Sequence, residues 1–271
     1  MEARAIGALA RTHARRMGLA LGFLTVIPMP NLPYSPAEMG RAGVWFPWVG
    51  LLMGGALWAT HAAATALFAP WLAAVAVVGC WAVLTGALHL DGLADCCDGL
   101  LPPVAQERRL EIMRDPRVGA FGVVGLVLFL AAKIGVVAEL GQAGWVLLLA
   151  PVWARWLLLW LARQPAARPG GMGAAFGDAL TGRIVGQAAL LPVALLLLSI
   201  SGLIPAWGGS AWASGWAAVG AVVAATLCMG AIIRFARARI GGVTGDVLGL
   251  GVELCELSVL LAYCAIAGLA F

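Results

Sequence analysis

The chain has 271 residues, of which 62% are hydrophobic and only 11% are charged. A soluble globular protein carries about 45–50% apolar and about 25% charged residues, so this composition excludes an ordinary soluble domain and is typical of a polytopic membrane protein. In such a protein, the formal charge of +4 reflects the basic residues of the cytoplasmic loops, so we expect no nucleic-acid partner.

Seven apolar stretches are long enough to cross about 30 Å of hydrocarbon as helices. They run approximately over residues 43–69, 70–90, 118–138, 143–162, 184–204, 211–233 and 247–270. The stretch 17–29 is shorter and proline-closed, and we interpret it as interfacial or re-entrant within a cytoplasmic N-terminal segment, 1–42. The sequence therefore predicts an all-α fold: one membrane-embedded domain over residues 1–271 with about seven spans.

Arginines alternate between the loops that join these spans. They precede the first span and fall between spans two and three, four and five, and six and seven, whereas the other loops carry none. Because basic residues gather on the cytoplasmic side, this pattern predicts a cytoplasmic N-terminus and cytoplasmic long loops. Four tryptophans lie at the ends of the spans that are remote from the arginine-bearing loops, as expected of an interfacial aromatic belt. They are Trp71, Trp145, Trp207 and Trp212.

The run His89-Leu-Asp-Gly-Leu-Ala-Asp-Cys-Cys-Asp-Gly99 follows the second span. On a helix, Asp91, Asp95 and Asp98 fall within one narrow arc, because they stand at i, i+4 and i+7. No basic residue interrupts the run, so the carboxylates repel one another unless a cation lies among them. Such hard oxygen ligands suit Mg²⁺ or Mn²⁺. A solvated charged face is the alternative, and His89 is a base, a substrate contact or a structural histidine.

A second polar run, Arg108 to Gly119, precedes the third span. Arginine binds phosphate oxygens in a bidentate manner, which makes Arg114 and Arg117 candidate phosphate ligands beside Asp115; ordinary membrane anchoring is the alternative. Gly119 and Gly122 open the span, where a helix N-terminus can receive an anion.

A third run, Gly241-Gly-Val-Thr-Gly-Asp246, precedes the last span. Glycines before a helix can present backbone N–H groups to a phosphate, while Asp246 is either a ligand or a helix cap.

Four charged residues lie within predicted spans: Lys133, Arg155, Glu253 and Glu256. Charge at that depth costs at least about 2.5–3.5 kcal/mol on insertion scales, which favours a functional role. Internal ion pairing is the alternative.

Four segments together resemble the cobalamin synthase, or adenosylcobinamide-GDP ribazoletransferase, family. They are Trp45-Phe-Pro-Trp-Val-Gly-Leu-Leu-Met-Gly54, Thr85-Gly-Ala-Leu-His-Leu-Asp-Gly-Leu-Ala-Asp-Cys-Cys-Asp-Gly99, Arg109-Leu-Glu-Ile-Met-Arg-Asp-Pro-Arg-Val-Gly-Ala-Phe-Gly122 and Gly241-Gly-Val-Thr-Gly-Asp-Val-Leu-Gly249. The resemblance covers nearly the whole chain, although residues 140–235 match mainly as hydrophobic pattern. One departure is Pro116, where a serine is common.

The resemblance implies magnesium-dependent transfer from adenosylcobinamide-GDP to α-ribazole or its 5′-phosphate, with release of GMP, at the inner membrane. The expected metal ligands are Asp91, Asp95, Asp98, Asp115 and Asp246. The expected phosphate ligands are Arg114, Arg117, Arg155, Gly241 and Gly242, and the expected catalytic residues are His89, Asp95 and Asp98. Besides the two substrates and the bilayer, association into a homo-oligomer or with other cobalamin-assembly enzymes is left open.

Two other functions remain as alternatives. A CDP-alcohol phosphotransferase also carries several aspartates on its membrane helices. The motif of that family is D-G-x-x-A-R, and this chain matches only its first two residues, at Asp91-Gly92. A cation-coupled transporter could use the intramembrane charges, but no internal repeat is visible.

Overall fold

The computed structural model describes residues 2–30, 32, 35–168, 170, 172–201 and 211–268, without the side chains of 2–6, 172 and 211–213. This part of the chain is helical, and its one β-type pairing is an isolated bridge between Ala166 and Val243. In chain order the elements are α1 Glu2–Leu24, α2 Pro36–Ala42, η1 Gly43–Trp45, α3 Phe46–Thr65, α4 Pro70–Thr85, α5 Leu88–Leu100, α6 Gln106–Ile112, α7 Ala120–Glu139, η2 Gly141–Ala143, α8 Val146–Ala162, α9 Met172–Ala179, α10 Gly182–Ala188, α11 Leu190–Ile200, α12 Ala211–Ile240 and α13 Gly245–Ala267.

The all-α membrane fold is confirmed, but the count of seven spans is not. Five helical segments in the described residues are long and apolar enough to cross a membrane: Pro36–Thr65, Ala120–Glu139, Gly182–Ile200, Ser214–Ile240 and Gly245–Ala267. A sixth span is counted if α4 and α5 form one crossing, although they are bent by 92°. The remaining stretch, α8, is apolar but has only 17 residues.

The bend between α4 and α5 corrects the predicted span 70–90. Gly86 and Ala87 both adopt left-handed backbone conformations, with φ of 60° and 56°. Glycine takes this conformation without steric cost, whereas alanine is strained there. Two successive left-handed residues end α4 and redirect the chain, so the aspartates lie on a separate helix.

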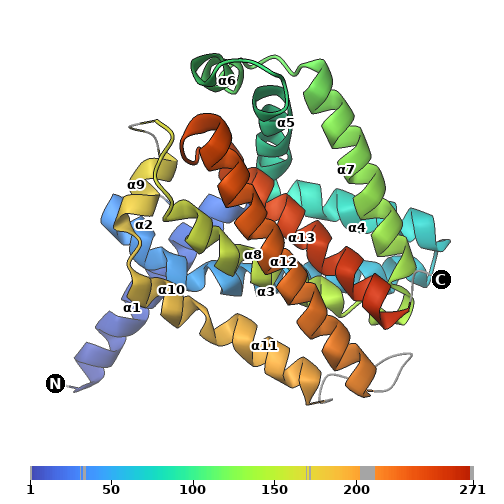
Figure 1. Cartoon of the computed structure of the whole chain (residues 1–271). Coiled ribbons are helices and arrows are strands. Elements are labelled where there is room, and N and C mark those ends of the chain that lie inside the picture. The colour runs from blue at the N-terminus through green and yellow to red at the C-terminus, as the bar shows by residue number, and fades with distance from the viewer. Residues whose placement is uncertain are drawn as a thin grey trace.

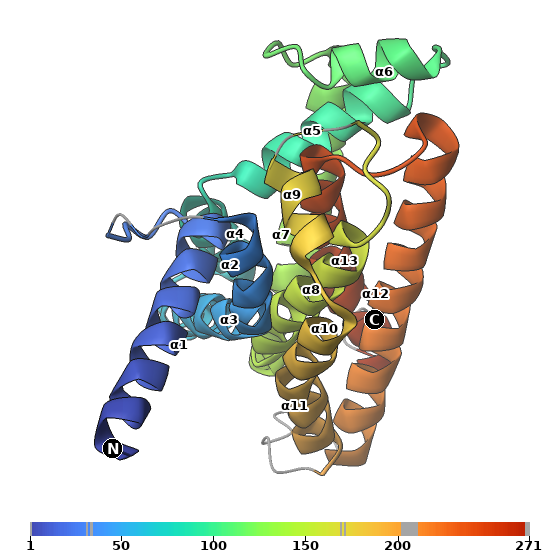
Figure 2. The same ribbon diagram turned by 90° about the vertical axis from the view of Figure 1, so that its left-hand side faces the viewer.

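The N-terminal stretch 17–29 is not an independent re-entrant segment. Residues up to Leu24 form the end of α1, a helix of 23 residues. This helix carries Arg11, Arg15 and Arg16 on its described part, and its N-terminal half extends away from the bundle (Figure 2). A basic amphipathic helix of this kind is suited to the bilayer surface.

The long last helix, α13, forms the centre of the bundle. It packs against α5, α8 and α12 and also contacts α7, and Figure 1 shows it crossing the middle of the molecule. A second close crossing joins α3 to α8, where a Cβ added to Gly50 would lie 2.6 Å from the carbonyl oxygen of Pro151. Small residues therefore allow the backbones to approach, as is common between membrane helices.

The predicted aromatic belt is correct only in part. Trp71 is exposed at the start of α4, but Trp145 is buried. Its ring packs edge-on against Tyr263 of α13, with centroids 5.5 Å apart, so it belongs to the core. Trp207 and the side chain of Trp212 lie outside the described residues.

Candidate active site

The carboxylates are brought together by a close crossing of α5 and the start of α13. A Cβ on Gly92 would lie 2.7 Å from the carbonyl oxygen of Asp246, and one on Gly249 would lie 3.1 Å from that of His89. Both distances are shorter than ordinary Cβ contacts, so a larger residue at Gly92 would force the backbones apart and one at Gly249 would have little room. The crossing places Asp246 beside the aspartates of α5, although about 150 residues separate them in the chain.

The prediction that Asp91, Asp95 and Asp98 share a helix is confirmed, because all three lie within α5. Their exposure falls along the helix: Asp91 is exposed, Asp95 is intermediate and Asp98 is buried. The carboxylate of Asp95 is within electrostatic reach of those of Asp91, Asp98 and Asp246. The four acids therefore form one region of strong negative potential, as expected where a cation is to be bound.

Asp98 has a structural task that the sequence did not reveal. Its two carboxylate oxygens accept hydrogen bonds from the backbone N–H groups of Gly119, at 2.7 Å, and Gly122, at 2.9 Å. These N–H groups open α7 and have no partner within the helix. The anion expected at this helix N-terminus is thus supplied by the protein itself. A metal or proton-transfer role for Asp98 stays a prediction. Each of its carboxylate oxygens still has a lone pair that is not used by these hydrogen bonds.

A cavity of about 310 Å³ opens beside the crossing. Its polar lining includes Asp91, Asp246, His89 and Arg168. His89 is buried, and its Nδ1 has no hydrogen-bond partner in the described structure. A titratable side chain that lines an acidic cavity is a candidate proton acceptor.

Arg168 is the site residue that the sequence analysis missed. Its guanidinium lies 3.5 Å from the carboxylate of Asp246, and its side chain lines the same cavity. In the sequence it stands in an arginine-bearing loop, where membrane anchoring accounts for it equally well. Its contact with Asp246 makes it the better-placed phosphate ligand at this cavity.

The glycine pair before α13 serves packing. A Cβ on Gly242 would collide with the backbone of residues 165–167, where Val243 donates to Pro165 and accepts from Ala167, both at 2.9 Å. The N–H of Gly241 donates to the carbonyl of Arg237. The N–H of Gly241 is thus already bonded and neither glycine lines the cavity, and a phosphate-binding role for Gly241 and Gly242 stays a prediction.

The loop between α6 and α7 forms a second cavity, of about 510 Å³, which Asp98, Asp115 and Arg117 line. Arg117 donates to both oxygens of Asp115, at 2.9 and 2.6 Å. These hydrogen bonds lower the pKa of Asp115 to about 2. Arg114 is exposed on the same loop.

The five predicted metal ligands consequently do not meet at one point. Asp91 and Asp246 line the first cavity, Asp98 and Asp115 line the second, and Asp95 lies on the helix between them. Within the described chain, no three His, Cys, Asp or Glu side chains converge closely enough to hold a metal ion. Mg²⁺ commonly takes only one or two carboxylates and completes its shell with water and substrate phosphates. The donor set fits an ion bound in that way.

The intramembrane charges neutralise one another in the bundle core. Lys133 donates to Glu253 at 2.7 Å and to Glu256 at 3.0 Å, and Arg155 pairs with Glu256. Arg155 is completely buried, so the prediction that it binds substrate phosphate is wrong and the ion-pair alternative is correct. The reason is the cost of an unpaired charge in a dry core, and the pairing leaves none of the four free for ion transport.

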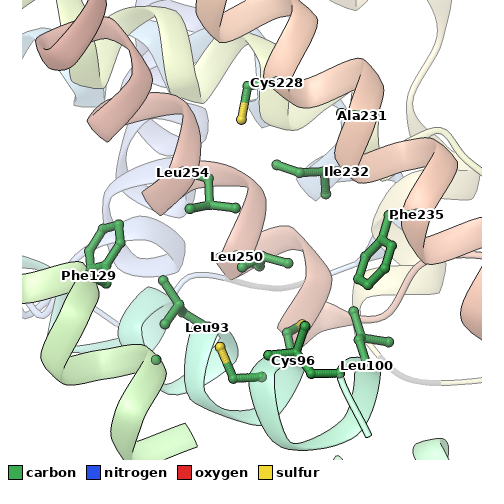
Figure 3. A pocket seen from close by; sticks show the side chains of 13 residues that line it. Leu93, Cys96, Leu100, Phe129, Cys228, Ala231, Ile232, Phe235, Leu250 and Leu254 are labelled. Carbon is green, nitrogen blue, oxygen red and sulfur yellow. The ribbon is translucent and has the colours of Figure 1, made fainter. Parts of the chain in front are cut away.

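An apolar cavity of about 630 Å³ lies on the other side of α5 (Figure 3). Leu93, Cys96 and Leu100 of α5 face Leu250 and Leu254 of α13 across it. No acidic or basic side chain lines this cavity. This face of α5 therefore offers no charged group to a phosphate, in contrast to the face that carries the aspartates.

Sequence comparison shows which known proteins this chain resembles. A family model described as cobalamin-5-phosphate synthase matches residues 16–264. An adenosylcobinamide-GDP ribazoletransferase of Thiobacillus denitrificans is 39% identical over 257 residues, covering 91% of this chain and 94% of the relative. Proteins of the same name from Pseudomonas entomophila and Roseiflexus are 40% and 37% identical, over 90% and 91% of this chain and 96% and 87% of theirs. No solved structure matches the chain.

Proposed function

The chain belongs to the cobalamin-5-phosphate synthase family, and on that premise we propose that it is an adenosylcobinamide-GDP ribazoletransferase of vitamin B12 biosynthesis. Its substrates are adenosylcobinamide-GDP and α-ribazole or α-ribazole 5′-phosphate. The observation that carries the proposal at the site is the acidic cavity where Asp91 and Asp246 meet His89 and Arg168.

In the proposed reaction, the 3′-hydroxyl oxygen of the ribazole ribose attacks the phosphorus on the cobinamide side of the diphosphate. The bond from that phosphorus to the bridging oxygen breaks, and GMP leaves with the oxygen. The product is adenosylcobalamin or its 5′-phosphate, and the hydroxyl proton passes to the protein. Catalysis of such a transfer is mostly positioning and neutralisation of charge.

The side chains at the first cavity divide these tasks. His89 accepts the hydroxyl proton on its imidazole ring, which lines the cavity. Arg168 holds a phosphate oxygen, and Asp246, 3.5 Å from it, orients its guanidinium. Arg114 and Arg117 bind the outer part of the diphosphate from their exposed loop. A cavity of about 310 Å³ accommodates only the reacting phosphates and ribose, and the corrinoid remains outside it.

Magnesium is the proposed cofactor. Asp91 and Asp246, which line the first cavity, are the residues that would hold it, and Asp98 and Asp115 are further candidates beside the second cavity. Asp95 lies on α5 between the two cavities and adds negative charge near the ion. When bound, the ion supplies positive charge to the diphosphate and its leaving group. Without it, four neighbouring carboxylates would repel an anionic substrate.

The arginine-bearing loops would face the cytoplasm, where both substrates are soluble, with the helices in the inner membrane.

A transfer assay in membranes tests the proposal. Adenosylcobinamide-GDP and α-ribazole are mixed with membranes that contain the protein, with excess Mg²⁺ or with a chelator, and the cobalamin product and GMP are quantified. We expect equal amounts of both products, loss of transfer in the chelator and recovery on adding Mg²⁺. Inserted protein that forms neither product would refute the assignment, and chelator-resistant transfer would refute the metal.

Two matched variants locate the chemistry. Asp95→Asn removes one central carboxylate with almost no change of volume, and we expect transfer to be abolished while membrane insertion is retained. Glu107→Gln makes the same kind of change on the exposed surface of α6 and should leave transfer unaffected. Near-normal activity of the Asp95 variant would contradict the role given to this acidic face.

A further inference from the structure

A separate basic cavity of about 770 Å³ lies where the N-terminal helices meet α10. Its walls come from α1, α2, η1, the start of α3, α10 and the start of α11. It shares no lining residue with the acidic cavity beside α5, so the proposed transfer does not account for it.

Three arginines line this cavity: Arg16 from α1, Arg41 from α2 and Arg183 from α10. Glu38 is their one carboxylate neighbour among the described residues, at 2.6 Å from Arg41 and 3.9 Å from Arg16. Arg183 forms no ion pair within the described structure and is exposed. The cavity thus retains an excess of positive charge, and guanidinium groups bind phosphate oxygens through paired N–H donors.

Buried polar atoms at the same cavity also lack partners. Trp45 and His13 both line it, and their rings contact each other edge-on, with centroids 5.7 Å apart. The Nε1 of Trp45 and the Nδ1 of His13 have no hydrogen-bond partner in the described structure. Polar atoms buried in proteins normally have a hydrogen-bond partner, so these two rings leave hydrogen-bonding capacity unused beside the cavity.

The lining of the cavity also includes large apolar side chains. Trp48, Leu190 and Leu191 line it, and both Trp48 and Leu190 are exposed near the starts of the two apolar helices α3 and α11. Tryptophan beside arginine at the end of a span is typical of the level of the lipid headgroups. A ligand that carries both an anionic group and apolar chains therefore matches this lining.

We propose that this cavity binds an anionic phospholipid, with its phosphate at Arg16, Arg41 and Arg183 and its acyl chains against Trp48 and Leu190. A soluble nucleotide would need only the basic part and would leave the apolar part in contact with water. The bound lipid would tie α1 and α2 to α10 at the membrane surface. This role does not depend on the transfer reaction proposed above.

Native mass spectrometry of the full-length protein in detergent tests the site. Phosphatidylglycerol and phosphatidylcholine with the same acyl chains are offered in equal amounts, and retained lipid is counted per protein. We expect several-fold preference for phosphatidylglycerol. Inorganic phosphate and glycerol phosphate are offered as competitors, and we expect neither to displace the lipid at equal concentration. Full displacement would overturn the lipid assignment in favour of a free-anion site.

Arginine variants then place the binding. Each basic residue near anionic headgroups contributes about 1 kcal/mol, or about fivefold in affinity. Arg183→Gln, which leaves the Glu38 ion pairs intact, should therefore lose roughly fivefold, and the triple glutamine variant on the order of a hundredfold. The triple lysine variant should retain most of the preference, because lysine keeps the charge.

The matched control is Arg237→Gln, an exposed arginine of α12 that does not line the cavity. It should bind phosphatidylglycerol as the unmodified chain does, and thermal midpoints establish that each variant is folded. A folded triple glutamine variant that keeps the preference, or a control that loses it equally, would overturn the proposal.

Discussion

Removing one charge from the buried ion-pair cluster should destabilise the protein strongly. The cluster of Lys133, Arg155, Glu253 and Glu256 contains two cations and two carboxylates, so it is neutral as a whole. Its side chains are at most 3% exposed, and Lys133 also lies 3.8 Å above the ring centroid of Trp81. Glu253→Gln keeps the shape but leaves one positive charge uncompensated in the helix bundle.

Breaking a buried ion pair by removing one partner costs about 3–5 kcal/mol, because the other charge stays desolvated. At about 2 °C per kcal/mol for a chain of this size, the thermal midpoint of Glu253→Gln should fall by about 6–10 °C. The assay is thermal unfolding of the purified protein in one detergent at one scan rate. The control is Glu139→Gln, the same change on the exposed end of α7, which should alter stability by less than about 0.5 kcal/mol.

A charge-balanced double variant tests the reasoning itself. Replacing Lys133 by Met and Glu253 by Leu removes one cation and one carboxylate and leaves the pair of Arg155 and Glu256. Apolar replacement of a whole buried pair is often neutral or stabilising, so the double variant should recover most of the lost midpoint. A single variant as stable as the control, or a double variant less stable than the single one, would refute the argument.

Three further predictions concern the site. Asp98→Ala leaves two N–H groups of α7 unpaired and should cost about 1–3 kcal/mol in thermal unfolding, and an unchanged midpoint would rule out the capping role. Gly92→Ala introduces a Cβ 2.7 Å from the carbonyl oxygen of Asp246 and should displace Asp246 from the cavity. We expect this displacement to lower transfer roughly a hundredfold. The control is Gly55→Ala, whose Cβ meets nothing within 4 Å and which should remain active. Because the pKa of Asp115 is lowered to about 2 from 3.8, its contribution to stability is present above about pH 4 and lost only as the pH falls through about 2. The midpoint difference between the wild-type chain and Asp115→Asn should therefore be constant from about pH 5 to pH 8, and a difference that varies across this interval would contradict the ion pair.

The sequence predicted those features that depend on local geometry and composition. Apolar length and arginine placement identified a helical membrane protein, since hydrocarbon accepts only segments that satisfy their own backbone hydrogen bonds. Helical periodicity placed Asp91, Asp95 and Asp98 on one face, because the angle per residue is a property of the helix alone.

Other features depended on which helices cross, and the sequence could not supply them. Gly92 and Gly249 are ordinary membrane-helix glycines until α5 and α13 meet, and only that crossing places Asp246 at the acidic cavity. Arg168 became a site residue through its contact with Asp246. Arg155 lies in the helix-bundle core and not at the predicted phosphate site, because its guanidinium pairs with Glu256 of another helix.

The physical difference lies in the range of the interactions. The length of an apolar span and the angular positions of residues around a helix are determined by residues within the same helix. The partner of a charge, the anion at a helix N-terminus and the walls of a cavity are set by residues distant in sequence, as Asp98 at the start of α7 shows. The chemical character of the site was therefore present in the sequence, while tertiary packing decided whether each charged side chain lies at the acidic cavity, at a helix N-terminus or in the core.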